Sequence, residues 1–207
     1  DYAKQLKQRG LNVPEIIAVD LDNGVYFQED LGDETLFDFL QKADENQIRD
    51  IYTKIVKLLP RWQVEATRGF DYTNVYPRKQ FDAQSIQWDL NYFKYYFLKL
   101  AEIPFDEEGL EEDFSVLKSY LLDTNCTYFL YRDFQSRNIM LAKDDVYFID
   151  FQGARQGALH YDLASLLYDA KANLDEDLRE QLLQTYLEEL SGYIEVDKQD
   201  FIDRYYA

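Results

Sequence analysis

Three oxygen-bearing side chains stand at a spacing that suits the chemistry of phosphate groups. Asp133 follows a short apolar run, Asn138 comes five positions later, and Asp150 follows a second apolar run. Carboxylate and amide oxygens are the hard ligands that Mg²⁺ prefers, and a carboxylate can accept a proton from an attacking hydroxyl. The set therefore predicts phosphoryl transfer, a reaction that depends mostly on positioning and electrostatic stabilisation.

Each of these residues alone has a plainer interpretation, because Asp and Asn are common in turns and at strand ends. Their joint spacing is more specific. An Asp and an Asn that share one loop, with a second Asp further on, form a divergent version of the protein-kinase pattern. Loops at strand ends hold polar groups rigidly and leave them accessible.

Short strands and many helices must position these groups. Apolar runs predict strands at 128–131, 139–141 and 146–149, and a hairpin of 16–19 and 25–27 around Asp22-Asn23-Gly24. Apolar residues at intervals of three and four predict helices. The predicted helices cover 1–9, 36–42, 48–58, 80–101, 110–122, 162–171, 176–191 and 197–206.

Composition limits the function classes. The chain has 207 residues, is 46% hydrophobic and carries a formal charge of −18. It is apolar enough for a packed core, and its charge argues against nucleic-acid binding. No run of eighteen apolar residues and no signal peptide is present. Cys126 is the single cysteine, which fits a reducing, cytoplasmic compartment.

The segment 128–170 resembles the aminoglycoside phosphotransferase and choline kinase group. The similarity lies in Tyr-Arg-Asp-Phe-Gln-Ser-Arg-Asn-Ile-Met (131–140), Ile-Asp-Phe-Gln-Gly-Ala-Arg-Gln-Gly (149–157) and Tyr-Asp-Leu-Ala-Ser-Leu-Leu-Tyr-Asp (161–169). Within that group, these motifs look most like the bacterial kinases that phosphorylate the anomeric hydroxyl of N-acetylmuramate or N-acetylglucosamine. The resemblance implies an ATP-dependent, or GTP-dependent, Mg²⁺-requiring kinase of an amino sugar.

The resemblance also implies a fold and a division of the chain. The fold would be α+β and protein-kinase-like, mainly the helical C-terminal lobe with a partial N-terminal lobe. Residues 1–27 would be the remnant of the N-terminal lobe, 28–32 the hinge, and 33–207 the helical catalytic lobe. At the hinge, the backbone of Glu29 and Leu31 would meet the nucleotide base; the alternative is an ordinary connecting loop.

The roles of individual residues follow from the same resemblance. Asp133 would be the catalytic base, and Asn138 and Asp150 would bind Mg²⁺. Asp162 would brace the catalytic loop through its backbone, or cap the following helix, or do both. Tyr131 stands where the group usually has His, and Gln152 where protein kinases have Gly.

Candidates for contact with the acceptor are weaker signals. Trp88 and Asp89 offer an aromatic face and a hydroxyl acceptor on the predicted helix 80–101. Arg137 and Arg155, with Arg132, offer guanidinium groups for phosphate or carboxylate. The alternative for Trp88 and Asp89 is a solvated Asp beside core aromatic side chains, and the alternative for Arg132 and Arg137 is a structural salt bridge.

No Gly-rich phosphate loop and no strand Lys precede residue 10. We therefore expect a chain truncated at both ends, and a fusion to another domain in the full protein stays open. Two competing functions stay open. One is an aminoglycoside or choline-type kinase of the same fold, and the other is a pseudokinase, a nucleotide-sensing module of a larger protein.

Overall fold

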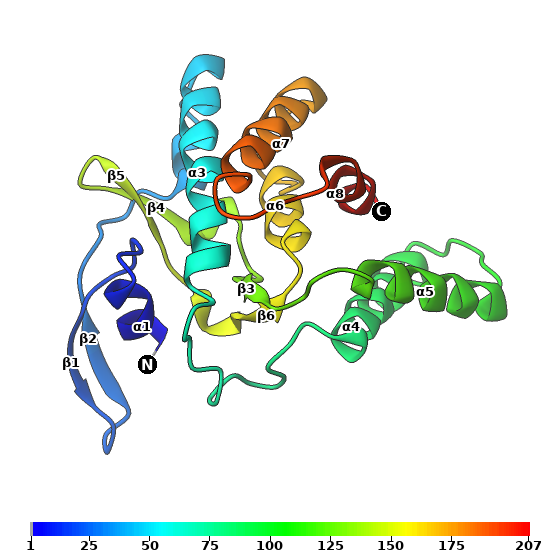
Figure 1. Cartoon of the computed structure of the whole chain (residues 1–207), viewed down its shortest axis with the longest axis horizontal. Coiled ribbons are helices and arrows are strands. Elements are labelled where there is room, and N and C mark those ends of the chain that lie inside the picture. Colours follow the sequence, from blue (N-terminus) through cyan, green and yellow to red (C-terminus); the bar gives the residue numbers. More distant parts are fainter. Residues whose placement is uncertain (1) are drawn as a thin grey trace.

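The computed structural model describes residues 2–207, and about half of them are helical, with three two-stranded antiparallel sheets. The N-terminal part is helix α1 (Tyr2–Gln8) and the hairpin of β1 (Ile16–Asp20) and β2 (Val25–Gln28). Gly10 ends α1 with a φ of 70°, and the hairpin turns at Gly24. Figure 1 shows α1 beside this hairpin, at the edge of the molecule.

Helices form the centre of the molecule. They are α2 (Leu36–Leu40), α3 (Glu45–Glu65), α6 (His160–Leu167), α7 (Glu176–Leu190) and α8 (Lys198–Tyr205). Thr35 and Asp44 start α2 and α3 with capping boxes. In Figure 1, α3 and α7 lie side by side, and α6 lies between α7 and the short strands. Within residues 2–207, no helix is both long and apolar enough to cross a membrane.

The short strands form two antiparallel pairs. β4 (Ile139–Ala142) and β5 (Asp145–Phe148), two strands that the sequence predicts, form a hairpin, and β3 (Tyr128–Leu130) pairs with β6 (Arg155–Gly157), a strand that the sequence does not predict. The strand β6 was missed because its three residues, Arg-Gln-Gly, are too few and too polar to show the alternation of a strand. Its pairing places the segment after Asp150 against the strand that precedes Asp133.

An aromatic cluster supports these loops. Trp62 of α3 lies 5.8 Å from Tyr131 and 4.8 Å from Phe148, measured between ring centroids. Phe134 stacks on Phe148 and meets Tyr131 edge to face. All four rings are at most 2% exposed. Close packing of large rigid groups fixes the backbone on both sides of Asp133.

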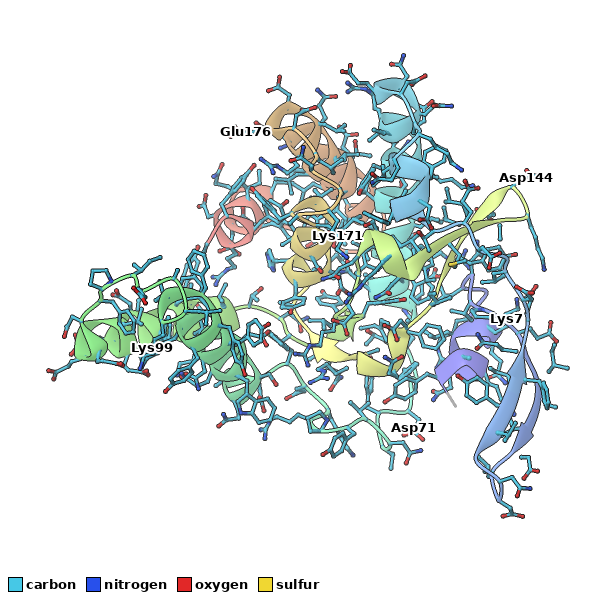
Figure 2. All side chains as sticks on the ribbon, turned by 180° about the vertical axis from the view of Figure 1, so that it is seen from behind. Lys7, Asp71, Lys99, Asp144, Lys171 and Glu176 are labelled. Atoms are coloured by element: carbon cyan, nitrogen blue, oxygen red, sulfur yellow. The ribbon has the colours of Figure 1, made fainter. Side chains whose placement is uncertain are left out.

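The predicted helix 80–101 is wrong in its second half. It is α4 (Ala83–Phe93) followed by a π-helix over Lys94–Leu98. With α5 (Glu107–Leu122), it forms an arm that projects from the rest of the molecule; Figure 2 labels Lys99 on this arm. The expected apolar face is buried at Ile86, 6% exposed, but Leu100 is 77% exposed. The periodic pattern therefore does not predict burial where no element packs on the helix.

Candidate active site

Asp162 holds the start of the loop that carries Asp133. Its two carboxylate oxygens accept hydrogen bonds from the backbone amides of Tyr131, at 2.8 Å, and Arg132, at 2.9 Å. Asp162 is fully buried, and burial raises its pKa to about 7, although both amide donors act in the opposite direction. It does not cap α6, because the N-cap position is Leu159.

Backbone contacts bring the segments of Asp133, Asn138 and Asp150 together. The Asn138 side chain donates from Nδ2 to the Asp133 carbonyl at 2.8 Å, and its own carbonyl accepts from the Ile149 amide at 3.0 Å. The Tyr131 hydroxyl donates to the Ile149 carbonyl. Tyr131 therefore ties the loop of Asp133 to the residue before Asp150.

Two residues of these loops have left-handed backbone conformations. Arg132 has a φ of 80°, and Asp150 has a φ of 65°. Such conformations cost free energy in residues other than Gly and persist only where the surroundings impose them. Arg132 directly precedes Asp133, and Asp150 is itself a predicted functional residue. Strained backbone of this kind concentrates at the active sites of enzymes.

The donor atoms fit a magnesium ion bound with a nucleotide. Because Nδ2 of Asn138 is held by the Asp133 carbonyl, its Oδ1 is the atom left to face a cation. The Asp150 side chain is exposed, and its Oδ1 accepts from Gln152 Nε2 at 2.5 Å. Mg²⁺ commonly uses one or two carboxylates and completes its octahedron with water and phosphate oxygens. Among residues 2–207, no cluster of three or more His, Cys, Asp or Glu side chains suggests an all-protein metal cage.

Some contacts at the site had no sequence prediction. The Asp169 carboxylate accepts from the Ser136 amide, at 3.0 Å, and from its hydroxyl, at 2.6 Å. Gly153 lies so close to the loop that a Cβ atom there would be 3.3 Å from Asp133 Oδ2. Asp169 lies in the motif used for the resemblance, but only the tertiary contact reveals what it binds.

The acceptor candidates fall into two groups. Asp89 on α4 contacts Arg132 Nη2 and the Tyr161 hydroxyl, both at 3.4 Å, and its neighbour Trp88 is 43% exposed. Burial raises the pKa of the Asp89 carboxyl, and the Arg132 charge opposes that shift. This group lies beside Asp133, because Arg132 precedes it.

The two remaining arginines differ sharply. Arg137 is exposed in the catalytic loop, whereas Arg155 is only 2% exposed on β6. Arg155 donates from Nε to the Gly153 carbonyl at 2.9 Å. Gly153 in turn lies close to the Asp133 carboxylate, so Arg155 is connected to Asp133 only indirectly.

Part of the predicted hinge already makes hydrogen bonds with neighbouring segments. The Glu29 amide donates to the Glu15 carbonyl at 2.8 Å, and its carboxylate accepts from the Glu15 amide and from Lys143. At Glu29, the backbone group left for a base is therefore the carbonyl. Leu31 follows in the same connector, before Gly32 with its φ of 77°.

An apolar cavity of about 200 Å³ lies elsewhere, between the α4–α5 arm, α6 and α8. Its lining includes Phe81, Leu121, Cys126, His160 and Tyr205. It contains none of Asp133, Asn138 and Asp150. Tyr161, whose hydroxyl contacts Asp89, also lines it, so the cavity adjoins the acceptor candidates without including the three predicted catalytic and metal-binding residues.

Sequence comparison finds relatives among bacterial amino-sugar kinases. The chain is 30% identical over 183 residues to an N-acetylmuramate/N-acetylglucosamine kinase of Neisseria meningitidis serogroup B, covering 86% of this chain and 52% of the relative. A kinase of the same description from Pseudomonas aeruginosa is 26% identical, with 86% and 50% covered. The chain thus spans about half the length of these curated relatives.

Solved structures share the fold. Amicoumacin kinase hAmiN matches with a TM-score of 0.65 and 15% identity, covering 99% of this chain and 65% of the other. The motif resemblance found in the sequence is confirmed at the family level, because the model of the phosphotransferase enzyme family matches residues 1–196. This chain therefore belongs to the APH phosphotransferase enzyme family and has its α+β, kinase-like fold.

Proposed function

We propose that the protein containing this chain transfers the γ-phosphoryl group of ATP, or GTP, to a hydroxyl of an amino sugar of the N-acetylmuramate or N-acetylglucosamine type. The carrying observation is the hydrogen-bonded frame in which Asp162 fixes the loop before Asp133, and Asn138 links that loop to Ile149, the residue before Asp150. The curated relatives phosphorylate these sugars by their descriptions, which favours this acceptor class.

In this proposal, Asp133 accepts the proton of the acceptor hydroxyl as its oxygen bonds to the γ-phosphorus and the bond to the nucleoside diphosphate breaks. Asn138 Oδ1 and the Asp150 carboxylate hold Mg²⁺, which neutralises charge on the phosphates. The related amicoumacin kinase binds AMP-PNP and Ca²⁺ in its solved complex, which supports a nucleotide with a divalent ion here.

The division of the chain is part of the same proposal. Residues 1–27 belong to an N-terminal lobe, 28–32 form the hinge, and 33–207 form the catalytic lobe with its helices. Backbone groups of Glu29 and Leu31 meet the base. Trp88 and Asp89 face the acceptor from α4, with Arg137 and Arg155 as further contacts.

The test uses the full-length protein and a panel of neutral sugars, N-acetylated sugars, aminoglycosides and choline, with the phosphorylated product identified by mass. Turnover of an N-acetylated sugar that Asp133→Ala abolishes, with nucleotide binding retained, is expected. Exclusive turnover of an aminoglycoside or choline would move the chain to that branch of the family. Nucleotide binding without turnover of any acceptor would identify a pseudokinase.

A further inference from the structure

Arg155 is a buried cation without a carboxylate partner among residues 2–207. It is 2% exposed, and its one hydrogen bond runs from Nε to the Gly153 carbonyl. Its Nη1 atom is buried and makes no hydrogen bond, and no described Asp or Glu forms a salt bridge with it. Arg155 lies opposite Leu130 in the β3–β6 pair, so its backbone is fixed by the sheet.

A guanidinium in this state destabilises the fold. Removing a charge from water costs several kcal/mol unless a partner or hydrogen bonds compensate. A methionine of similar length would fill the same space without that cost. The retained charge therefore calls for a partner that is not part of the described chain.

The unpaired group lies next to the candidate chemistry. Its hydrogen-bond acceptor, Gly153, is placed so that a Cβ atom there would be 3.3 Å from Asp133 Oδ2 and 3.8 Å from Arg132 Cδ. Arg155 is close enough to feel the charges of Arg132, Asp133 and Asp89. Through Gly153, both arginines therefore lie in the neighbourhood of the proposed catalytic base.

The only described carboxylate that contacts either arginine is Asp89, and its ion pair with Arg132 is weak. Its contact with Arg132 is a single one at 3.4 Å, and the two side chains are 40% and 30% exposed. Its contact with the Tyr161 hydroxyl is equally long. Partly exposed ion pairs of this geometry contribute little free energy, so an incoming anion can displace this one at small cost.

We propose that Arg155 and Arg132 form a subsite for an oxyanion of the bound reactants, which enters by displacing Asp89 from Arg132. This inference rests on the proposed function and specifies its ligand chemistry. Paired guanidinium groups bind carboxylate and phosphate oxygens through charge-assisted hydrogen bonds. The oxyanion has two sources, a carboxylate on the acceptor or a phosphate group of the nucleotide, and steady-state kinetics separates them.

The experiment compares wild-type full-length protein with Arg155→Met, using N-acetylmuramate, which carries a lactyl carboxylate, and N-acetylglucosamine, which lacks one. For an acceptor carboxylate, the ratio of KM for N-acetylmuramate to KM for N-acetylglucosamine rises about tenfold or more in the variant. For a nucleotide phosphate, KM for ATP rises by a similar factor and the acceptor ratio stays constant. An unchanged ratio together with an unchanged KM for ATP overturns the subsite.

Two further variants guard against a merely structural effect. Arg68→Met removes an exposed Arg from the loop after α3 and should leave all three KM values unchanged. Arg155→Met should keep or raise Tm, since a structural salt bridge would instead lower it. Asp89→Asn removes the competing carboxylate. The ratio of KM for N-acetylmuramate to KM for N-acetylglucosamine, in which a hydroxyl contact shared by both sugars cancels, or else KM for ATP, should therefore change in the opposite direction to Arg155→Met; equal shifts in both variants contradict the proposal.

The experiment also distinguishes failure of the proposed function from failure of the subsite. Wild-type protein that phosphorylates neither sugar contradicts the amino-sugar kinase. The subsite is then judged by calorimetric titration of N-acetylmuramate and of inorganic pyrophosphate onto wild type and Arg155→Met. Weaker binding of either probe to the variant supports the subsite, and equal binding of both overturns it.

Discussion

Single carboxylates organise this site by accepting backbone hydrogen bonds as well as by offering charge. Asp162 fixes two amides before Asp133, and Asp169 fixes the amide and hydroxyl of Ser136 after it. Hydrogen bonds to charged acceptors are stronger than those between neutral groups. The loop that presents Asp133 is therefore held from both sides by acids that need not touch a substrate.

Asp150→Asn should weaken nucleotide binding in the presence of Mg²⁺ and leave Mg²⁺-free binding unchanged. The substitution keeps the shape and the left-handed backbone, which Asn tolerates, but removes the charge that favours the cation. We expect the Mg²⁺-dependent gain in affinity to fall about tenfold or more, measured by titration with and without EDTA. An equal Mg²⁺ effect in both proteins would remove Asp150 from the metal site.

Gly153→Ala should lower kcat with little effect on stability. The new methyl would lie 3.3 Å from Asp133 Oδ2, and a shift of that carboxylate would misplace the proposed general base. We expect a loss of about tenfold in kcat, measured at saturating substrates.

Gly157→Ala is the matched control for that change. Its methyl would lie 2.3 Å from Leu130 Cδ1 and 3.0 Å from Leu130 Cβ, so it should lower the free energy of unfolding by about 1–3 kcal/mol. If Gly153→Ala lowered Tm as much as Gly157→Ala and left kcat unchanged, the close approach would be a packing feature alone.

At the scale of elements, the α4–α5 arm shows that a periodic apolar pattern on a helix does not by itself decide which of its side chains are buried. α4 contacts the catalytic loop through Asp89 and packs Ile86 against Leu130 and Phe81. Beyond the π-helix, no described element covers the apolar side chains that continue the pattern, and Lys94 is instead buried by its salt bridges to Glu107 and Glu111 of α5. The near end of the arm is therefore part of the site, and the far end is not.

Ile86→Ala and Leu100→Ala test this division. Both residues lie on one predicted apolar face, but Ile86 is 6% exposed and Leu100 is 77% exposed. Ile86→Ala should lower the free energy of unfolding by about 2–4 kcal/mol, and Leu100→Ala by less than about 0.5 kcal/mol. Chemical denaturation of both variants provides the measurement. A large loss at Leu100 would mean that the arm is covered in solution.

At the scale of the whole molecule, the partly buried His160 links stability to pH. His160 stacks on Phe201 of α8 with 4.0 Å between ring centroids. Burial, assisted by the Arg204 charge and opposed by Asp200, lowers its pKa to about 4. The unfolded chain, with a pKa near 6.5, therefore binds this proton more readily than the folded chain does.

The sign of the effect follows from that difference. The contribution of neutral His160 is fully present above pH ~6.5 and is lost as pH falls toward 4. The total loss from this group is at most about 3 kcal/mol. His160→Gln should show a smaller loss of stability between pH 7 and pH 5 than wild type, measured by urea unfolding. Identical losses would mean that His160 does not titrate between the two states.

The sequence alone determined the family and indicated the candidate catalytic segments, because Asp133, Asn138, Asp150 and the residues around them carry a specific local pattern. It also determined most helices and two hairpins, since 3.6-residue and two-residue periodicities and turn residues are local properties. The α+β, kinase-like fold was implied by the family resemblance, and the predicted order of elements agrees with it.

Only the tertiary structure decided what these segments contact. The pairing of β6 with β3, the contact of Asp169 with Ser136 and the isolation of the Arg155 guanidinium depend on residues far apart in the chain. No local periodicity encodes such contacts, because they arise when packing brings distant segments together and excludes water. For the same reason, one apolar stripe on α4 is core at Ile86 and surface at Leu100.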